Sequence, residues 1–284
     1  METFKLLVVM TILSLFSANI AFAESENILT DTQLIKQIKK YDKKINRSPE
    51  KANLYIKRGF LKFCLKDYGS AIEDYTQAEE LEPKCSDIYY ARGRVWYERK
   101  NYEEALEDFD KAVKLNKKDS KIYISRGITR YKNGNLLGAQ ADFNLAIRYN
   151  KKAHNAYANR GIVRDALKNY QGALEDYQKA IKLCNYAPDT YYNMGQTKCK
   201  LGNYEEGIED FTKAIEQNPK YSMAYYKRGL AYLKLDNKQF AKSDFNMAYQ
   251  LNPANKEAKE ALDNLEQELK ELYDTTLPEW MLSE

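Results

Sequence analysis

The stretch YYARGRVW, residues 89–96, places Gly93 in the middle of a segment that is otherwise typical of a helix. Glycine inside a helix costs roughly 1 kcal/mol relative to alanine, so its presence there needs a reason. The same glycine returns every 34 residues, in six units without an insertion, as Gly59, Gly93, Gly127, Gly161, Gly195 and Gly229. A fixed period of this length predicts a solenoid of stacked supersecondary units.

Other positions repeat with the same period when each unit is numbered so that this glycine is position 8. Position 4 is tyrosine, position 24 is tyrosine or phenylalanine, position 20 is alanine or glycine, and position 27 is alanine in every unit. Proline stands at position 32 in three units, as Pro83, Pro219 and Pro253. Small residues at positions 8, 20 and 27 let two helices approach closely, and the aromatic residues fill the space around that contact.

This pattern resembles the tetratricopeptide repeat, whose signature has the same residue types at these positions. The resemblance covers residues 52–255 and implies an all-α, right-handed solenoid, or superhelix, of helix-turn-helix repeats. Turn signals such as residues 133–135 (Asn-Gly-Asn) separate helix A from helix B in each repeat. Repeats one to six are residues 52–85, 86–119, 120–153, 154–187, 188–221 and 222–255.

The flanking segments fit the need of a solenoid to cover its terminal apolar faces. Residues 24–51 form an N-terminal segment that includes a degenerate half-repeat, with Tyr41 at position 24 and Pro49 at position 32. Residues 256–273 carry leucines at helical spacing and predict a C-terminal capping helix. Residues 274–284 form a tail with Trp280, for which either folding back onto that helix or protruding as a docking segment fits the sequence.

Residues 1–23 have the features of a secretory signal peptide. Lys5 precedes an apolar run from Leu6 to Phe16, and small residues, Ala21 and Ala23, stand before the expected cleavage point. The alternative, an uncleaved anchor, is weaker because the apolar run is short for a bilayer. We therefore expect an exported protein, periplasmic or secreted, with no membrane insertion after cleavage.

Four cysteines could form disulfides in an exported protein, namely Cys64, Cys85, Cys184 and Cys199. Their places near opposite ends of neighbouring helices would separate their Cα atoms by about 15 Å, more than the roughly 7 Å that a disulfide can bridge. The sequence therefore predicts free, largely buried thiols.

Two charged positions depart from the usual repeat pattern. Position 23 is aspartate in all six repeats, and position 7 is arginine in all but the fifth, where Met194 replaces it and Lys198 at position 11 could reach the same carboxylate. Because solvated positions rarely keep one identity, we expect a ladder of partly buried ion pairs that fixes helix register. Its members are Arg58, Arg92, Arg126, Arg160 and Arg228 with Asp74, Asp108, Asp142, Asp176, Asp210 and Asp244.

Catalytic chemistry has no visible basis in the sequence. His154 is the single histidine, and neither a glycine-rich phosphate loop nor a close set of His and Cys ligands occurs. The formal net charge of +4 is small for a protein that would grip nucleic acid. We expect no enzymatic activity, no cofactor, no metal and no nucleic-acid partner.

A binding groove is the remaining prediction, because the resemblance implies that the A helices line the concave side of the solenoid. Groove positions carry aromatic, amide and cationic side chains, which suit an extended peptide or a helix of acidic character. A self-assembling structural element is the alternative, although we favour a monomer. The predicted groove residues are Tyr90, Arg94, Tyr97, Lys121, Tyr131, Lys132, Asn159, Tyr192, Asn193, Lys200, Tyr226, Lys227 and Lys234.

Overall fold

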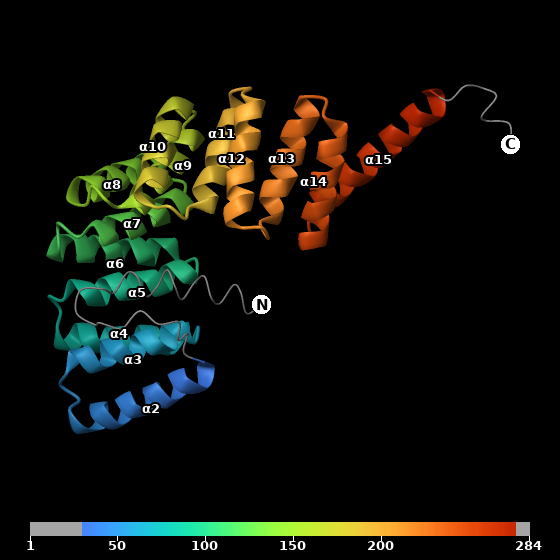
Figure 1. Ribbon diagram of the computed structural model, residues 1–284. Coiled ribbons are helices and arrows are strands. Elements are labelled where there is room, and N and C mark those ends of the chain that lie inside the picture. The colour runs from blue at the N-terminus through green and yellow to red at the C-terminus, as the bar shows by residue number, and fades with distance from the viewer. Residues whose placement is uncertain (1–29, 277–284) are drawn as a thin grey trace. The chain divides into compact units, whose positions relative to one another are not determined.

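The computed structural model describes residues 30–276 and divides into two compact units at Lys151 and Lys152. Within the described range the secondary structure is entirely helical, as predicted. Each unit is a stack of antiparallel helical hairpins in which every helix packs mainly against its neighbours in the chain (Figure 1). The predicted signal peptide and the Trp280 tail lie outside the described residues.

The helices follow the 34-residue period. In the first unit they are α2 (Asp31–Arg47), α3 (Ala52–Cys64), α4 (Tyr68–Leu81), α5 (Ser86–Glu98), α6 (Tyr102–Leu115), α7 (Ser120–Lys132) and α8 (Leu136–Tyr149). In the second they are α9 (His154–Ala166), α10 (Tyr170–Leu183), α11 (Pro188–Lys200), α12 (Tyr204–Gln217), α13 (Ser222–Lys234), α14 (Lys238–Leu251) and α15 (Lys256–Thr276).

The glycine that recurs at position 8 of every repeat lies where helix A contacts the aromatic ring of helix B. A Cβ atom on Gly161 would lie 2.5 Å from Cε1 of Tyr177, and one on Gly127 would lie 2.9 Å from Cε1 of Phe143. These distances are too short for any real side chain, so the close approach of the two helices explains the glycine. The packing of the pair offsets the helical cost of the residue.

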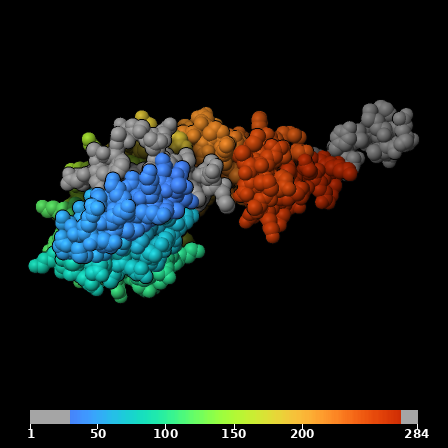
Figure 2. Space-filling view, turned by 90° about the horizontal axis from the view of Figure 1, so that it is seen from below, coloured from blue at the N-terminus to red at the C-terminus, as the bar shows by residue number. Residues whose placement is uncertain are grey.

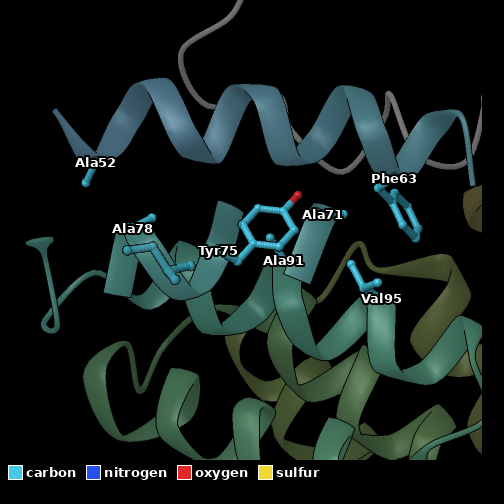
Figure 3. Packing of buried hydrophobic residues seen from close by; sticks show 8 residues of the cluster. Ala52, Phe63, Ala71, Tyr75, Ala78, Ala91 and Val95 are labelled. Carbon is cyan, nitrogen blue, oxygen red and sulfur yellow. The ribbon is translucent and has the colours of Figure 1, made fainter. Parts of the chain in front are cut away.

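The first hydrophobic cluster shows how one hairpin is joined to the next (Figure 3). Ala52 of α3 lies above Ala78 of α4, and Phe63 at the other end of α3 lies above Val95 of α5. Tyr75 of α4, which is 1% exposed, lies between them. Each hairpin thus buries its apolar side chains partly against itself and partly against the following A helix, which is why a single repeat would not be stable alone.

The turn inside each repeat is made at position 15, where the backbone takes a left-handed conformation. The φ angle there is +82° at Gly134 and +85° at Gly202, but non-glycine residues hold the same conformation in the other four repeats. They are Lys66, Lys100, Lys168 and Asp236, with φ between 58° and 64°. The sequence also indicates a turn at Lys-Asn-Tyr, residues 100–102, but it marks the left-handed conformation only where glycine occupies position 15.

Both ends of the described chain are capped by helices. Thr30 and Gln33 form a reciprocal capping box that begins α2, and Leu34 and Ile45 bury the helix against the first repeat. In Figure 2 the blue surface of α2 runs without a break into the lighter blue of the following helices. The N-terminal cap is thus the helix α2, of 17 residues.

At the other end, Ala258, Leu262 and Leu265 of α15 are buried on the predicted stripe. The second half of α15 extends beyond α14 (Figure 1). No helix among residues 30–276 has both the length and the apolar character needed to cross a bilayer.

Candidate functional site: charged ladder and A-helix faces

The charged ladder joins the two helices of each repeat. In five repeats the position-7 arginine binds the position-23 aspartate through both Nε and an Nη atom, at distances of 2.6–3.0 Å. The aspartates are 1–5% exposed. Each such fork has the planar geometry of a bidentate guanidinium–carboxylate pair, which fixes the rotation of one helix against the other.

Four of the arginines also contact the residue at position 25 of the preceding repeat or, for Arg58, of the capping helix α2. The Nη1 atom lies 2.8 Å from Asp42 for Arg58 and 2.7 Å from Asp110 for Arg126. In repeats two and six the acceptor is a hydroxyl instead, Thr76 for Arg92 at 3.2 Å and Thr212 for Arg228 at 2.9 Å. The ladder therefore links neighbouring hairpins as well as the helices inside each one.

A second cation at position 11 binds the same aspartate in repeats one, three and four. Lys62 Nζ lies 3.0 Å from Asp74, and Arg130 Nη1 lies 2.9 Å from Asp142. Arg164 lies 3.0 Å from Asp176. Two cations around one buried carboxylate compensate its desolvation more fully than one does.

Repeat five has only the position-11 cation. Met194 is buried among Tyr177 and Ala173, and Lys198 Nζ lies 2.9 Å from Oδ2 of Asp210. That oxygen is buried and lacks a hydrogen bond of good geometry. Burial raises the pKa of Asp210 despite the attraction of Lys198. This carboxylate is the least well compensated member of the ladder among those described.

The predicted groove residues of the first unit differ in how much of each side chain is exposed. The ring of Tyr90 is 6% exposed and packs 6.0 Å from Phe109, so it supports the surface and offers little of it. The guanidinium of Arg94 lies over the rings of Tyr90 and Phe63. Lys132 is exposed beside the half-buried Tyr131, whereas Tyr97 and Lys121 are half-buried.

The second unit places its predicted groove residues on the neighbouring helices α9, α11 and α13. Lys227 lies over the ring of Tyr226 at 5.3 Å, and Lys234 is exposed at the end of α13. Asn159, Tyr192 and Asn193 are half-buried. Neither Lys227 nor Lys234 has an ion-pair partner among residues 30–276. We call the residues Asn159, Tyr192, Asn193, Tyr226, Lys227 and Lys234 the α9/α11/α13 face.

Two contacts between α9 and α11 join residues that the sequence pattern does not pair. Asp165 of α9 accepts a 2.7 Å hydrogen bond from Thr197 and forms an ion pair with Lys200 of α11. Lys200 is therefore engaged within the chain. Its partner Asp165 lies 35 residues earlier, which is one period plus one residue. Because the pair occurs once among the described repeats, no residue pattern of period 34 indicates it.

The four cysteines are free and half-buried. Burial raises the pKa of both Cys64 and Cys199 to about 11, so these thiols stay protonated at neutral pH. The sulfur of Cys199 also explains Gly207, because a Cβ atom at position 20 of this repeat would lie 2.5 Å from it.

Family models match several parts of the chain. Models described as tetratricopeptide repeat match residues 65–120, 188–221 and 211–244, and one described as TPR repeat matches residues 166–202. A comparison with curated proteins gave no match.

Solved structures share the fold at low sequence identity. The APC/C hetero-tetramer Cut9-Hcn1 is 16% identical with a TM-score of 0.69, and the alignment covers 92% of this chain but 52% of that one. YrrB, described as a TPR protein with an unusual peptide-binding site, is 23% identical with a TM-score of 0.55 over 66% of this chain and 97% of its own. PilF of Pseudomonas aeruginosa is 17% identical with a TM-score of 0.65, over 74% and 95% respectively. These likenesses concern the fold.

Proposed function

We propose that this chain, parts of which match models of the tetratricopeptide repeat, is an exported, non-enzymatic scaffold that binds a peptide or helix of a partner protein. The observation that carries the proposal is the α9/α11/α13 face. Tyrosines, amides and two lysines without a carboxylate partner lie together there on three A helices of one unit.

The composition of the face indicates the chemistry of the partner. The amide groups of Asn159 and Asn193 can hydrogen-bond the backbone of an extended segment, and Tyr192 and Tyr226 provide rigid contact area. Lys227 and Lys234 favour acidic side chains at one end of that segment. The partner we propose is therefore an acidic peptide or helix.

The test is a pair of charge-matched double variants, used to recover partners from an envelope extract. Lys227→Glu/Lys234→Glu reverses the two lysines of the face, whereas Lys179→Glu/Lys182→Glu makes the same charge change at exposed positions of the B helix α10. The first should lose the partner and the second should keep it. Cross-linking the recovered complex should join the partner's acidic segment to α11 or α13. Equal recovery by both variants would contradict the proposal.

Export and oligomeric state have their own measurements. We propose that residues 1–23 act as a secretory signal, so the N-terminal residue of the mature protein in a periplasmic or culture fraction should be Glu24. Light scattering during size exclusion at micromolar concentration should give a monomer. A mass that grows with concentration would instead support the self-assembling element and count against a free binding face.

A further inference from the structure

An open pocket of about 190 Å³ lies beside the second repeat, where α5 and α6 meet the middle of α4. Its walls are the ring of Trp96, the side chains of Ile72 and Thr76, the carboxylates of Glu104, Glu107 and Asp108, and the cations Arg92 and Lys111. None of these residues occupies a groove position, so the pocket is separate from the A-helix faces described above.

The fifth repeat shows what a cation does at the equivalent place. Helix α12 carries Glu206, Glu209, Asp210 and Lys213 at the positions that Glu104, Glu107, Asp108 and Lys111 occupy in α6. In that repeat Lys198 reaches between two of these carboxylates, and its Nζ lies 3.3 Å from Glu206 and 2.9 Å from Asp210. The second repeat has Trp96 at the position of Lys198. The two acids are present there without the ammonium.

The charge balance around the pocket agrees with a missing cation. Asp74, Asp142 and Asp176 each receive two cations, whereas Asp108 receives only Arg92. Arg92 is itself shared with Glu79 at 2.5 Å, and Lys111 also points toward Glu79 at 3.7 Å. Glu104 and Glu107 have no ion-pair partner within residues 30–276. Three carboxylates and two cations line the pocket, and both cations also contact Glu79, so the pocket keeps a net negative charge.

The sixth repeat shows that an aromatic residue at position 11 does not by itself leave such a site. There Tyr232 stacks on Phe240, with ring centroids 5.2 Å apart, and Phe240 stands at the position that Glu104 holds in the second repeat. The aromatic pair replaces both the cation and the acid. Among the six repeats, the second alone combines an aromatic residue at position 11 with glutamate at position 19.

We propose that this pocket receives the side-chain ammonium of a lysine from a partner protein. The ammonium lies between Glu104 and Asp108, as the ammonium of Lys198 lies between Glu206 and Asp210, and the methylene stem of the lysine packs on Trp96. Trp96 already has the guanidinium of Arg99 over its ring at 5.3 Å, so the ring provides apolar contact and the carboxylates provide the attraction. This goes beyond the proposed function, because it names a second contact with opposite charge preference.

The test uses two small probes, Nα-acetyl-lysine-N-methylamide and the same molecule acetylated on its Nζ atom. Binding is followed by nuclear magnetic resonance, from the indole N–H of Trp96 and the backbone amides of α6. The charged probe should shift these signals saturably, and loss of the charge should weaken binding by about tenfold or more, as expected for an ion pair at a partly buried site. Equal shifts from both probes would overturn the proposal.

Matched variants place the binding in this pocket. Glu104→Gln should weaken binding of the charged probe at least about threefold, because it removes one carboxylate from the ammonium. Glu206→Gln makes the same change in the fifth repeat, where Lys198 occupies the site, and should leave binding at α6 unchanged. Trp96→Lys should abolish binding by filling the pocket with the chain's own ammonium. Glu104 is exposed, so Glu104→Gln should keep the fold. Unchanged binding of the charged probe by Glu104→Gln, or by Trp96→Lys that is shown to be folded, would contradict the proposed lysine site.

Failure of this site and failure of the groove are distinguishable. Lys227→Glu/Lys234→Glu changes the second unit and should leave the probe titration at α6 unaltered. Glu104→Gln should likewise leave binding of an acidic segment to the α9/α11/α13 face unaltered. Each result therefore tests one surface.

Discussion

Lys198 Nζ lies 2.9 Å from Oδ2 of Asp210 and is the one cation that forms an ion pair with it within residues 30–276, whereas three other aspartates of the ladder have two. Met194 occupies the place of the second cation. The raised pKa of Asp210 means that the folded state binds a proton there more tightly than the unfolded state does. Stability is therefore lost as pH rises from near the ordinary value of 3.8 through the raised pKa of the folded protein.

Met194→Arg should stabilise the protein by roughly 1 kcal/mol at pH 7, because it adds the bidentate partner that the other repeats have. The added charge lowers the pKa of Asp210, so the gain over wild type should be smaller at pH 4 than at pH 7. Urea unfolding at both pH values measures this difference. A gain that does not depend on pH, or a loss at pH 7, would show that Lys198 already compensates Asp210.

Arg228→Met should destabilise the protein more than Arg126→Met does. The first leaves Asp244 buried with Tyr232 at position 11, and the cost of such an uncompensated charge is roughly 3–5 kcal/mol. The second leaves Arg130 at 2.9 Å from Asp142, so its cost should be about half as large. Thermal unfolding of both variants measures the difference. As a control, Arg228→Met/Asp244→Leu should recover most of the loss, because no buried charge remains.

Gly161→Ala should cost about 1–3 kcal/mol, because its Cβ would lie 2.5 Å from the ring of Tyr177 and the two helices would have to separate. Gly69→Ala is the control. That glycine is the second residue of α4 and has nothing within 4 Å of an added Cβ, so alanine should be neutral or stabilising by up to about 1 kcal/mol. Urea unfolding of the two variants compares the effect of packing with that of helix propensity, and similar results for both would contradict the close-approach explanation.

Lys168→Gly should stabilise the protein by about 1 kcal/mol, because lysine at φ 62° holds a left-handed conformation that glycine adopts without strain. Gly202→Ala is the reverse change at the same turn position of the next repeat, where φ is +85° and nothing contacts the added Cβ. It should destabilise by a similar amount. If both variants have wild-type melting temperatures, the turn is not strained.

The hairpins could be predicted from the sequence because the residues that hold their two helices together are of the same type at the same position in every repeat. Glycine at position 8 and an aromatic residue at position 24 mark the same close contact six times, and aspartate at position 23 indicated a buried partner in the same way. The turns were visible at Lys100 as well as at Gly134 and Gly202, but their left-handed conformation was visible only at the glycines, because lysine does not signal that conformation.

Contacts between repeats were harder to predict because their members change along the chain. The acceptor at position 25 is an aspartate in one repeat and a threonine in another, so it has no single identity to recognise. The pair of Asp165 and Lys200 occurs once. The acids around Trp96 look like an ordinary solvated helix face until the equivalent lysine of the fifth repeat is placed beside them.

The reach of Arg58, Arg92, Arg126 and Arg228 to the preceding hairpin limits how freely these repeats could be reordered. Arg126 ends on the carboxylate of Asp110, while Arg228 ends on the hydroxyl of Thr212. A block moved to another place in the chain, or duplicated, would carry its arginine to a new neighbour and could meet an acceptor of different charge. The repeats share one fold, but the contact between two successive repeats depends on which repeats they are. A repeat exchanged with another therefore needs the position-25 acceptor of its arginine exchanged as well.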